Sequence, residues 1–296
     1  MKIVQSFWSI PSFRSSSTIQ NRSFGGWPSA SYNYFSWTYS CLQFKKFYKD
    51  VCLITDTPGK HLLIDLLELP YSDYSTELDG LSHYAPDLWA IGKLYAYRSQ
   101  NAPFIHADGD VIIWDHLGKA LENSELIVQN EDGDFSFYRD TLSEIDLHFT
   151  YVPDVIQTAL KKNGGKIHSV NAGIIGGNHI EFFKMYVDEA LSFIENNRNH
   201  LDKIKKGKFN AVFEQYLFRS LAQENKIPIT SFYGQAVTDY AEFIDLVNIP
   251  KKSTYFHPVG LFKKEAHVCR ELEYRFRMEY PERYYHIAEL LEKRYI

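Results

Sequence analysis

Short apolar runs alternate along the chain with longer segments in which apolar residues recur every three or four positions. The apolar runs are typical of buried strands, and the clearest ones span 2–8, 51–55, 103–114, 125–129 and 169–177. The helical spacing is clearest over 30–48, 86–98, 179–197 and 210–225. Strands that alternate with helices predict an α/β fold with a mostly parallel central sheet flanked by helices.

Weaker signals complete this pattern. They predict helices over 59–67 and 153–162, and strands over 71–78, 227–232 and 254–256. Asn210 precedes an apolar helical run, so we expect it to be the N-cap of that helix. The segment between Ser9 and Pro28 is rich in Ser, Asn and Gly and predicts a loop.

The C-terminal part of the chain differs from the rest. From Glu265 onward it is charged and follows a helical pattern that is interrupted at Pro281. No repeat, low-complexity tract or evident linker divides the preceding sequence. We therefore expect one catalytic-type domain over 1–263 and a C-terminal helical extension over 264–296.

Composition and charge exclude several classes of protein. The chain has 296 residues, of which 45% are hydrophobic, and its net charge is −5, so it can bury a large core but carries no basic excess for nucleic acid. Cys41, Cys52 and Cys269 form neither a zinc motif nor a disulfide framework, which favours a reducing compartment. No apolar segment is long enough for a signal peptide or a transmembrane helix. We expect a cytoplasmic protein; peripheral membrane contact and the oligomeric state stay open.

The strongest chemical signal is an acidic pair, Asp108 and Asp110, that follows an apolar strand. Gly109 between them lets the backbone turn, so that both carboxylates can converge. Because two buried carboxylates repel each other, a divalent cation such as Mg²⁺ or Mn²⁺ is the natural partner. The alternative is a solvated Asp-Gly turn between hairpin strands. The apolar residues on both sides of the pair favour the metal site.

Three later segments carry further candidates. Asn171 and Gly173 lie in a buried run, where glycine allows a ligand to approach the backbone. A glycine-rich connection explains the following Gly176 and Gly177 equally well. Glu214 lies at the margin of an apolar helical stripe, next to Gln215. Its carboxylate is expected to be paired or to face a cleft, and the alternative is an interface glutamate that extends to solvent.

The last of these segments runs from His257 through Gly260 to Lys263. Histidine can ligate a metal, lysine can balance phosphate charge, and glycine leaves backbone amides accessible to an anion. A structural histidine at a strand end is the alternative.

In this order the four segments resemble the motifs of GT-A fold glycosyltransferases, most closely the retaining family 8, which includes glycogenin and bacterial lipopolysaccharide galactosyltransferases. The resemblance implies that Asp108, Asp110 and His257 bind Mn²⁺. It further implies a nucleotide-sugar site to which these motifs contribute Asp108, Gly109, Asp110, Gly173, Gly260 and Lys263. The residues that would face the donor sugar or the acceptor are Asn171, Glu214 and Gln215.

The function implied by this resemblance is a metal-dependent transfer of sugar from a nucleotide-sugar, with UDP as the expected nucleotide. The acceptor would be a glycan, a lipid-linked glycan or a protein, and the family implies retention of configuration. One alternative is a phosphatase of the haloacid-dehalogenase type, although its Asp-x-Asp motif usually opens the domain. A non-catalytic nucleotide- or glycan-binding protein on a transferase scaffold is the other.

Overall fold

The computed structural model describes residues 1–13, 23–244 and 246–296. Residues 14–22 of the predicted polar loop lie outside this part of the chain. The chain divides into two compact units. The first unit contains residues 1–86, 107–117 and 239–296, and the second contains 87–106 and 118–238.

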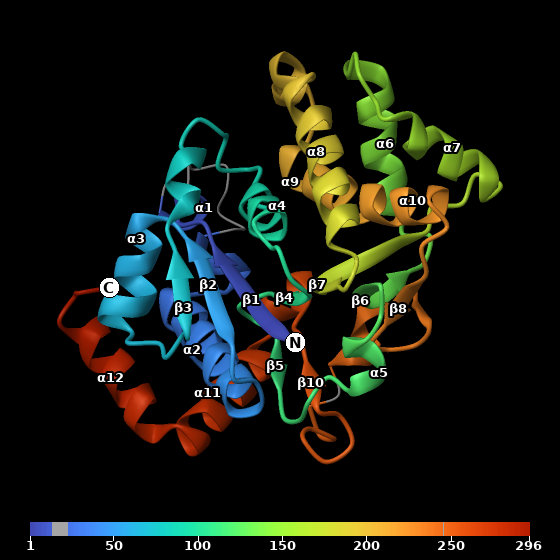
Figure 1. The fold of residues 1–296 in the computed structure, drawn as a ribbon. Coiled ribbons are helices and arrows are strands. Elements are labelled where there is room, and N and C mark those ends of the chain that lie inside the picture. Colours follow the sequence, from blue (N-terminus) through green and yellow to red (C-terminus); the bar gives the residue numbers. More distant parts are fainter. Residues whose placement is uncertain (14–22, 245) are drawn as a thin grey trace. The chain divides into compact units, whose positions relative to one another are not determined.

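The sheet of the first unit contains three parallel strands in the order β3-β2-β1 (Figure 1). These strands are β1 (Lys2–Phe7), β2 (Val51–Thr55) and β3 (Asp73–Ser75). A separate antiparallel ribbon pairs β5 (Ile112–Ile113) with β10 (Tyr255–Phe256), so that it joins segments far apart in the sequence.

The helices of the first unit surround a core that is rich in aromatic rings. The α-helices are α1 (Ile10–Phe13), α2 (Ala30–Phe47), α3 (Thr57–Lys60), α11 (Ala266–Glu279) and α12 (Pro281–Glu292). A π-helical turn, His61–Leu66, continues α3. Short 3-10 helices span Ser23–Gly26, Glu77–Leu81, Tyr240–Phe243 and Gly260–Lys264.

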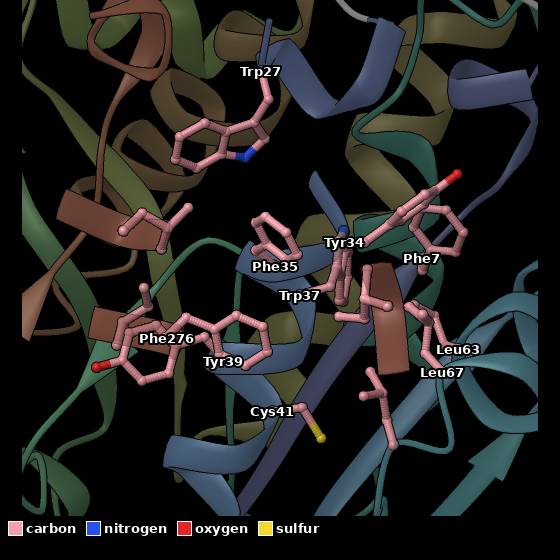
Figure 2. Close-up of a cluster of buried hydrophobic side chains, with 14 of the residues drawn as sticks. Phe7, Trp27, Tyr34, Phe35, Trp37, Tyr39, Cys41, Leu63, Leu67 and Phe276 are labelled. Carbon is pink, nitrogen blue, oxygen red and sulfur yellow. The ribbon is translucent and has the colours of Figure 1, made fainter. Parts of the chain in front are cut away.

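The two C-terminal helices take part in this core. Figure 2 shows Phe276 of α11 beside Phe35 and Tyr39 of α2, and the ring centroids are 5.6 and 5.7 Å apart. Phe276 is fully buried, and the Tyr39 hydroxyl donates a hydrogen bond to Glu279 Oε1 at 2.5 Å. α11 and α12 therefore belong to the same hydrophobic core as α2. That they form an extension to a catalytic domain ending at residue 263 stays a prediction.

The second unit has a mixed sheet in the order β4-β7-β6-β8, with β9 also paired to β6. Its strands are β4 (Phe104–Ala107), β6 (Leu126–Asp132), β7 (Ser169–Gly177), β8 (Ile229–Ser231) and β9 (Ala236–Val237). β6 is antiparallel to β7 and parallel to β8 and β9. A Cβ on Gly176 would lie 2.1 Å from Phe104 O, so the glycine permits the close approach of β7 to β4.

Helices flank the strands of this unit (Figure 1). They are α4 (Ile91–Arg98), α5 (Lys119–Glu122), α6 (Ser136–His148), α7 (Asp154–Lys162), α8 (Ile180–Glu195), α9 (Lys206–Ala211) and α10 (Leu217–Glu224). A π-helical turn, Val212–Tyr216, connects α9 to α10, and a 3-10 helix spans Arg198–Lys203. The predicted α/β class with mostly parallel strand pairing is confirmed.

The predicted starts of two helices were wrong. α4 begins at Ile91, because residues 86–90 form turns. Asn210 is inside α9 and does not cap it. Its buried amide accepts a hydrogen bond from Ala90 N at 2.9 Å and donates one to Asp87 O at 2.7 Å. The side chain therefore closes the turn that precedes α4, which explains why a polar residue occupies a buried helical position.

Within the described residues, no helix combines the length and apolar character needed to cross a membrane.

Candidate functional site

The acidic pair lies on a tight turn between β4 and β5. Val111 N donates a hydrogen bond to Asp108 O at 3.0 Å, which closes the turn. Asp110 is buried, whereas Asp108 is half-buried. The sequence placed this pair at the end of an apolar strand, and the structure confirms that position.

Gly109 is required by its contact with α2. A Cβ at this position would lie 2.3 Å from Cε2 of Trp37, so any other side chain would collide with the indole ring. The sequence predicts that Gly109 turns the backbone. The contact with Trp37 supplies a different physical reason, one that depends on a residue distant in the sequence.

His257 reaches the acidic pair through the β5–β10 ribbon. Phe256 pairs with Ile112 in this ribbon, and His257 follows Phe256 directly. His257 Nε2 lies 3.5 Å from Asp110 Oδ1. One donor atom from each of Asp108, Asp110 and His257 lies within 4.8 Å of the other two, so the three predicted metal ligands form one cluster.

Lys263 supplies the positive charge of this cluster. Its ammonium pairs with Asp110 Oδ2 and donates a hydrogen bond to Gly25 O at 2.9 Å. Burial raises the pKa of the Asp110 carboxyl, but the neighbouring Lys263 and His257 outweigh burial and hold this pKa below its usual range. Gly260, three residues earlier, has a φ of 59°, a left-handed conformation that favours glycine.

The chemistry and spacing of the cluster fit a divalent cation. Two ligands that lie about 2.1 Å from one ion can be at most about 4.2 Å apart. The ligand atoms of the three residues lie within 4.8 Å of one another, so a shift of the side chains by well under an ångström would bring them into range. His257 Nε2 and Asp110 Oδ1, which are 3.5 Å apart, are already within range. Carboxylate oxygens suit both Mg²⁺ and Mn²⁺, while the imidazole favours Mn²⁺ because Mg²⁺ is bound mainly by oxygen.

The second unit holds a different charged cluster, around Glu214. Glu214 is fully buried in the π-helical turn Val212–Tyr216, a type of distortion that is frequent at functional sites. Its Oε1 lies 2.7 Å from Lys93 Nζ and accepts a hydrogen bond from the Tyr97 hydroxyl at 2.9 Å. Glu214, which the sequence places at the margin of an apolar helical face, therefore belongs to a buried ion pair. The sequence alone did not reveal Lys93 as its partner.

The other sugar-facing candidates lie near this ion pair within the second unit. Lys93 Nζ also donates to Ala172 O at 3.3 Å, in the strand that carries Asn171 and Gly173. Asn171 Oδ1 accepts a hydrogen bond from Gly173 N at 2.9 Å. Gln215 Oε1 accepts one from the Tyr138 hydroxyl at 2.8 Å. The structure thus brings Glu214, Ala172 and Lys93 together, and it fixes the side chains of Asn171 and Gln215 by local hydrogen bonds.

These observations define an α/β protein with a candidate metal centre of two carboxylates and one imidazole. The chain belongs to a family of unknown function (DUF6734), whose model matches residues 1–290. No curated protein matches the chain.

Solved structures similar to this chain include mouse xyloside xylosyltransferase 1 in its apo form. The identity is 9% and the TM-score 0.41, covering 78% of this chain and 84% of that one. Another is the galactosyltransferase LgtC in complex with donor and acceptor sugar analogues. Its identity is 12% and its TM-score 0.37, covering 72% of this chain and 70% of that one.

Proposed function

We propose that the protein is a metal-dependent glycosyltransferase that moves a sugar from a nucleotide-sugar, with UDP as the nucleotide, to a glycan, lipid-linked or protein acceptor. The observation that carries the proposal is the convergence of Asp108, Asp110 and His257, with Lys263 paired to Asp110. The order of the four motifs along the chain supports it further.

In this proposal, Asp108, Asp110 and His257 hold Mn²⁺ or Mg²⁺. When bound, such an ion supplies positive charge that stabilises a departing diphosphate. Lys263 exchanges its pairing with Asp110 for pairing with phosphate oxygens, as an ammonium on a flexible stem can do. Gly260 leaves the backbone amides of its turn accessible to the same anion, and Gly109 and Gly173 line the nucleotide-sugar site.

Asn171, Glu214 and Gln215 are proposed to act on the donor sugar or the acceptor. A sugar that loses its leaving group develops positive charge, and a carboxylate or amide oxygen stabilises that charge. Lys93 balances the charge of Glu214 inside the protein, which keeps a carboxylate tolerable at a buried position. Retention of configuration is proposed on the family resemblance alone.

Thermal unfolding with and without ligand tests the metal and nucleotide parts of the proposal. Two carboxylates repel a diphosphate, so UDP should stabilise the protein only together with Mn²⁺, and EDTA should remove the effect. At about a hundred times its dissociation constant, UDP should add about 2.7 kcal/mol to the free energy of unfolding. Asp110→Asn should lose most of this gain. His257→Ala should lose less, because water can replace one nitrogen ligand.

An equal UDP shift in EDTA, or one that Asp110→Asn leaves unchanged, would contradict the proposal. Activity is then tested with Mn²⁺ and a panel of nucleotide-sugars, of which one should be hydrolysed slowly without acceptor as water enters the acceptor site. Cleavage of p-nitrophenyl phosphate without turnover of any nucleotide-sugar would instead favour the phosphatase.

A further inference from the structure

Three side chains from β1 and α2 hold the backbone of the acidic turn. Ser36 Oγ donates a hydrogen bond to Gly109 O at 3.1 Å, and Ser40 Oγ donates one to Val111 O at 2.5 Å. Gln5 Nε2 lies 3.4 Å from Asp108 O and donates to Ser40 Oγ at 2.9 Å. All three side chains are buried.

The spacing of the two serines matches the turn that they hold. Ser36 and Ser40 are four residues apart on α2, so they lie on one face of the helix and about 6 Å apart along its axis. The carbonyls of Gly109 and Val111 are two residues apart in the turn, and each accepts a hydrogen bond from one of these serines. One helical turn can therefore bind both carbonyls at once.

The orientation of the Gln5 amide is fixed by a further residue. The Tyr71 hydroxyl donates a hydrogen bond to Gln5 Oε1 at 2.8 Å. The amide oxygen is thereby engaged as an acceptor, which turns the NH₂ group toward Ser40 and Asp108 O. A chain of hydrogen bonds thus runs from Tyr71 through Gln5 and Ser40 to the turn.

We infer that Gln5, Ser36 and Ser40 are positioning residues for the metal centre. They fix the backbone that carries Asp108 and Asp110 before a cation binds, although the two carboxylates repel each other. This inference rests on the proposed metal-dependent function. Residues that orient metal ligands in this way typically contribute about 10–100-fold to metal affinity.

A purely structural role makes a different prediction, because buried carbonyls need donors in any protein. Removal of a donor would then lower stability and leave the metal affinity of the folded protein unchanged. Metal affinity and stability must therefore be measured separately on each variant.

The experiment compares Ser36→Ala and Ser40→Ala with Thr38→Val in the full chain. Thr38 lies on the same helix between the two serines, and it too is buried. Its hydroxyl has no hydrogen-bond partner among the residues that the structure describes. Thr38→Val therefore removes a buried hydroxyl from α2 without touching the acidic turn.

Mn²⁺ binding is titrated without nucleotide, with free Mn²⁺ followed by electron paramagnetic resonance well below the melting temperature. Each serine variant should bind Mn²⁺ about 10–100-fold more weakly than the wild type, with an unchanged far-UV circular dichroism spectrum. Thr38→Val should bind within about twofold of the wild type, below the range expected for a positioning residue.

Serine variants that bind as tightly as the wild type would overturn the inference and leave the proposed function standing. The same weakening in Thr38→Val would also overturn it, because the effect would then come from general loosening of α2. Absence of Mn²⁺ binding by the wild type would overturn both. If Ser40→Ala does not fold, Ser36→Ala decides alone, since it removes a single bond.

Discussion

The ion pair between Lys263 and Asp110 predicts how the protein responds to a substitution and to a metal. Lys263→Met keeps an unbranched side chain of similar length but removes the ammonium. Asp110 then loses its lysine partner inside the protein, where its side chain is only 9% exposed. His257 Nε2 stays 3.5 Å away and provides partial compensation.

The expected loss of stability is large enough to measure. Removal of one partner of a buried ion pair costs about 3–5 kcal/mol. We expect the lower end of this range, because His257 remains and the Lys263 side chain is 15% exposed. For a protein somewhat smaller than this one, each kcal/mol lowers the melting temperature by about 2–4 °C. A loss of about 3 kcal/mol should therefore lower the midpoint by about 6–12 °C in EDTA.

Mn²⁺ should restore most of the melting temperature lost in Lys263→Met, because a bound cation neutralises the charge of Asp110 in place of the lysine. In the wild type the same ion must first displace Lys263 from the carboxylate. The Mn²⁺-induced rise in melting temperature should therefore be larger in Lys263→Met than in the wild type, and Mn²⁺ should bind the variant more tightly. The variant should also gain less from added UDP, since it lacks the proposed phosphate partner.

Melting curves in EDTA, in Mn²⁺ and in Mn²⁺ with UDP measure all three effects. Lys251→Met is the control, because Lys251 is an exposed lysine of the same unit and its loss should not alter the Mn²⁺ response. Two results would refute the reasoning. One is a Lys263→Met midpoint in EDTA equal to that of the wild type. The other is a loss that Mn²⁺ does not reduce.

The principal strands could be predicted because their signal is local. Residues 2–8, 51–55 and 169–177 are apolar runs bounded by polar or glycine residues, and β1, β2 and β7 lie there. α6, in contrast, was missed although Tyr138, Leu142 and Ile145 follow a helical spacing, because a polar surface helix with few buried residues gives a weaker signal than an apolar strand.

The metal candidates could be predicted because residue type and order carry the information. Asp108, Asp110 and His257 belong to recognisable segments, and the structure confirms that they lie together. Their supports could not be predicted in the same way. Ser36 and Ser40 lie in an aromatic-rich helix, and two serines one turn apart do not by themselves show which backbone carbonyls they bind.

Long-range partners explain what the sequence left open. Lys93 and Glu214 form an ion pair although more than a hundred residues separate them in the sequence. The sequence favours a helix end for Asn210 because polar residues are common there, but its partners Ala90 and Asp87 lie equally far away along the chain. Periodicity reports which side chains are buried, and it does not report which buried polar groups meet.

Three further predictions test the two units separately. Glu214→Gln leaves the Lys93 ammonium without its carboxylate, so the free energy of unfolding should fall by about 3–5 kcal/mol. Turnover per folded molecule should fall as well, and unchanged turnover in the folded variant would remove Glu214 from the proposed reaction. Burial raises the pKa of Cys41 to about 12, so at pH 8 only about one thiol in 10⁴ is ionised. Mass spectrometry should therefore find Cys41 modified by iodoacetamide only after the protein is unfolded. Rapid labelling of the native protein would contradict this burial. Phe276→Ala should lower the free energy of unfolding by about 3–5 kcal/mol. The Phe276 ring is fully buried where α11 packs against α2, and its removal leaves a cavity. Met278→Ala on the same helix is the control, since Met278 is 63% exposed and its loss should change the urea midpoint little. If the two variants unfold at the same urea concentration, α11 does not contribute to the core, and the C-terminal helices must then be separable from the unit that carries Asp110 and His257.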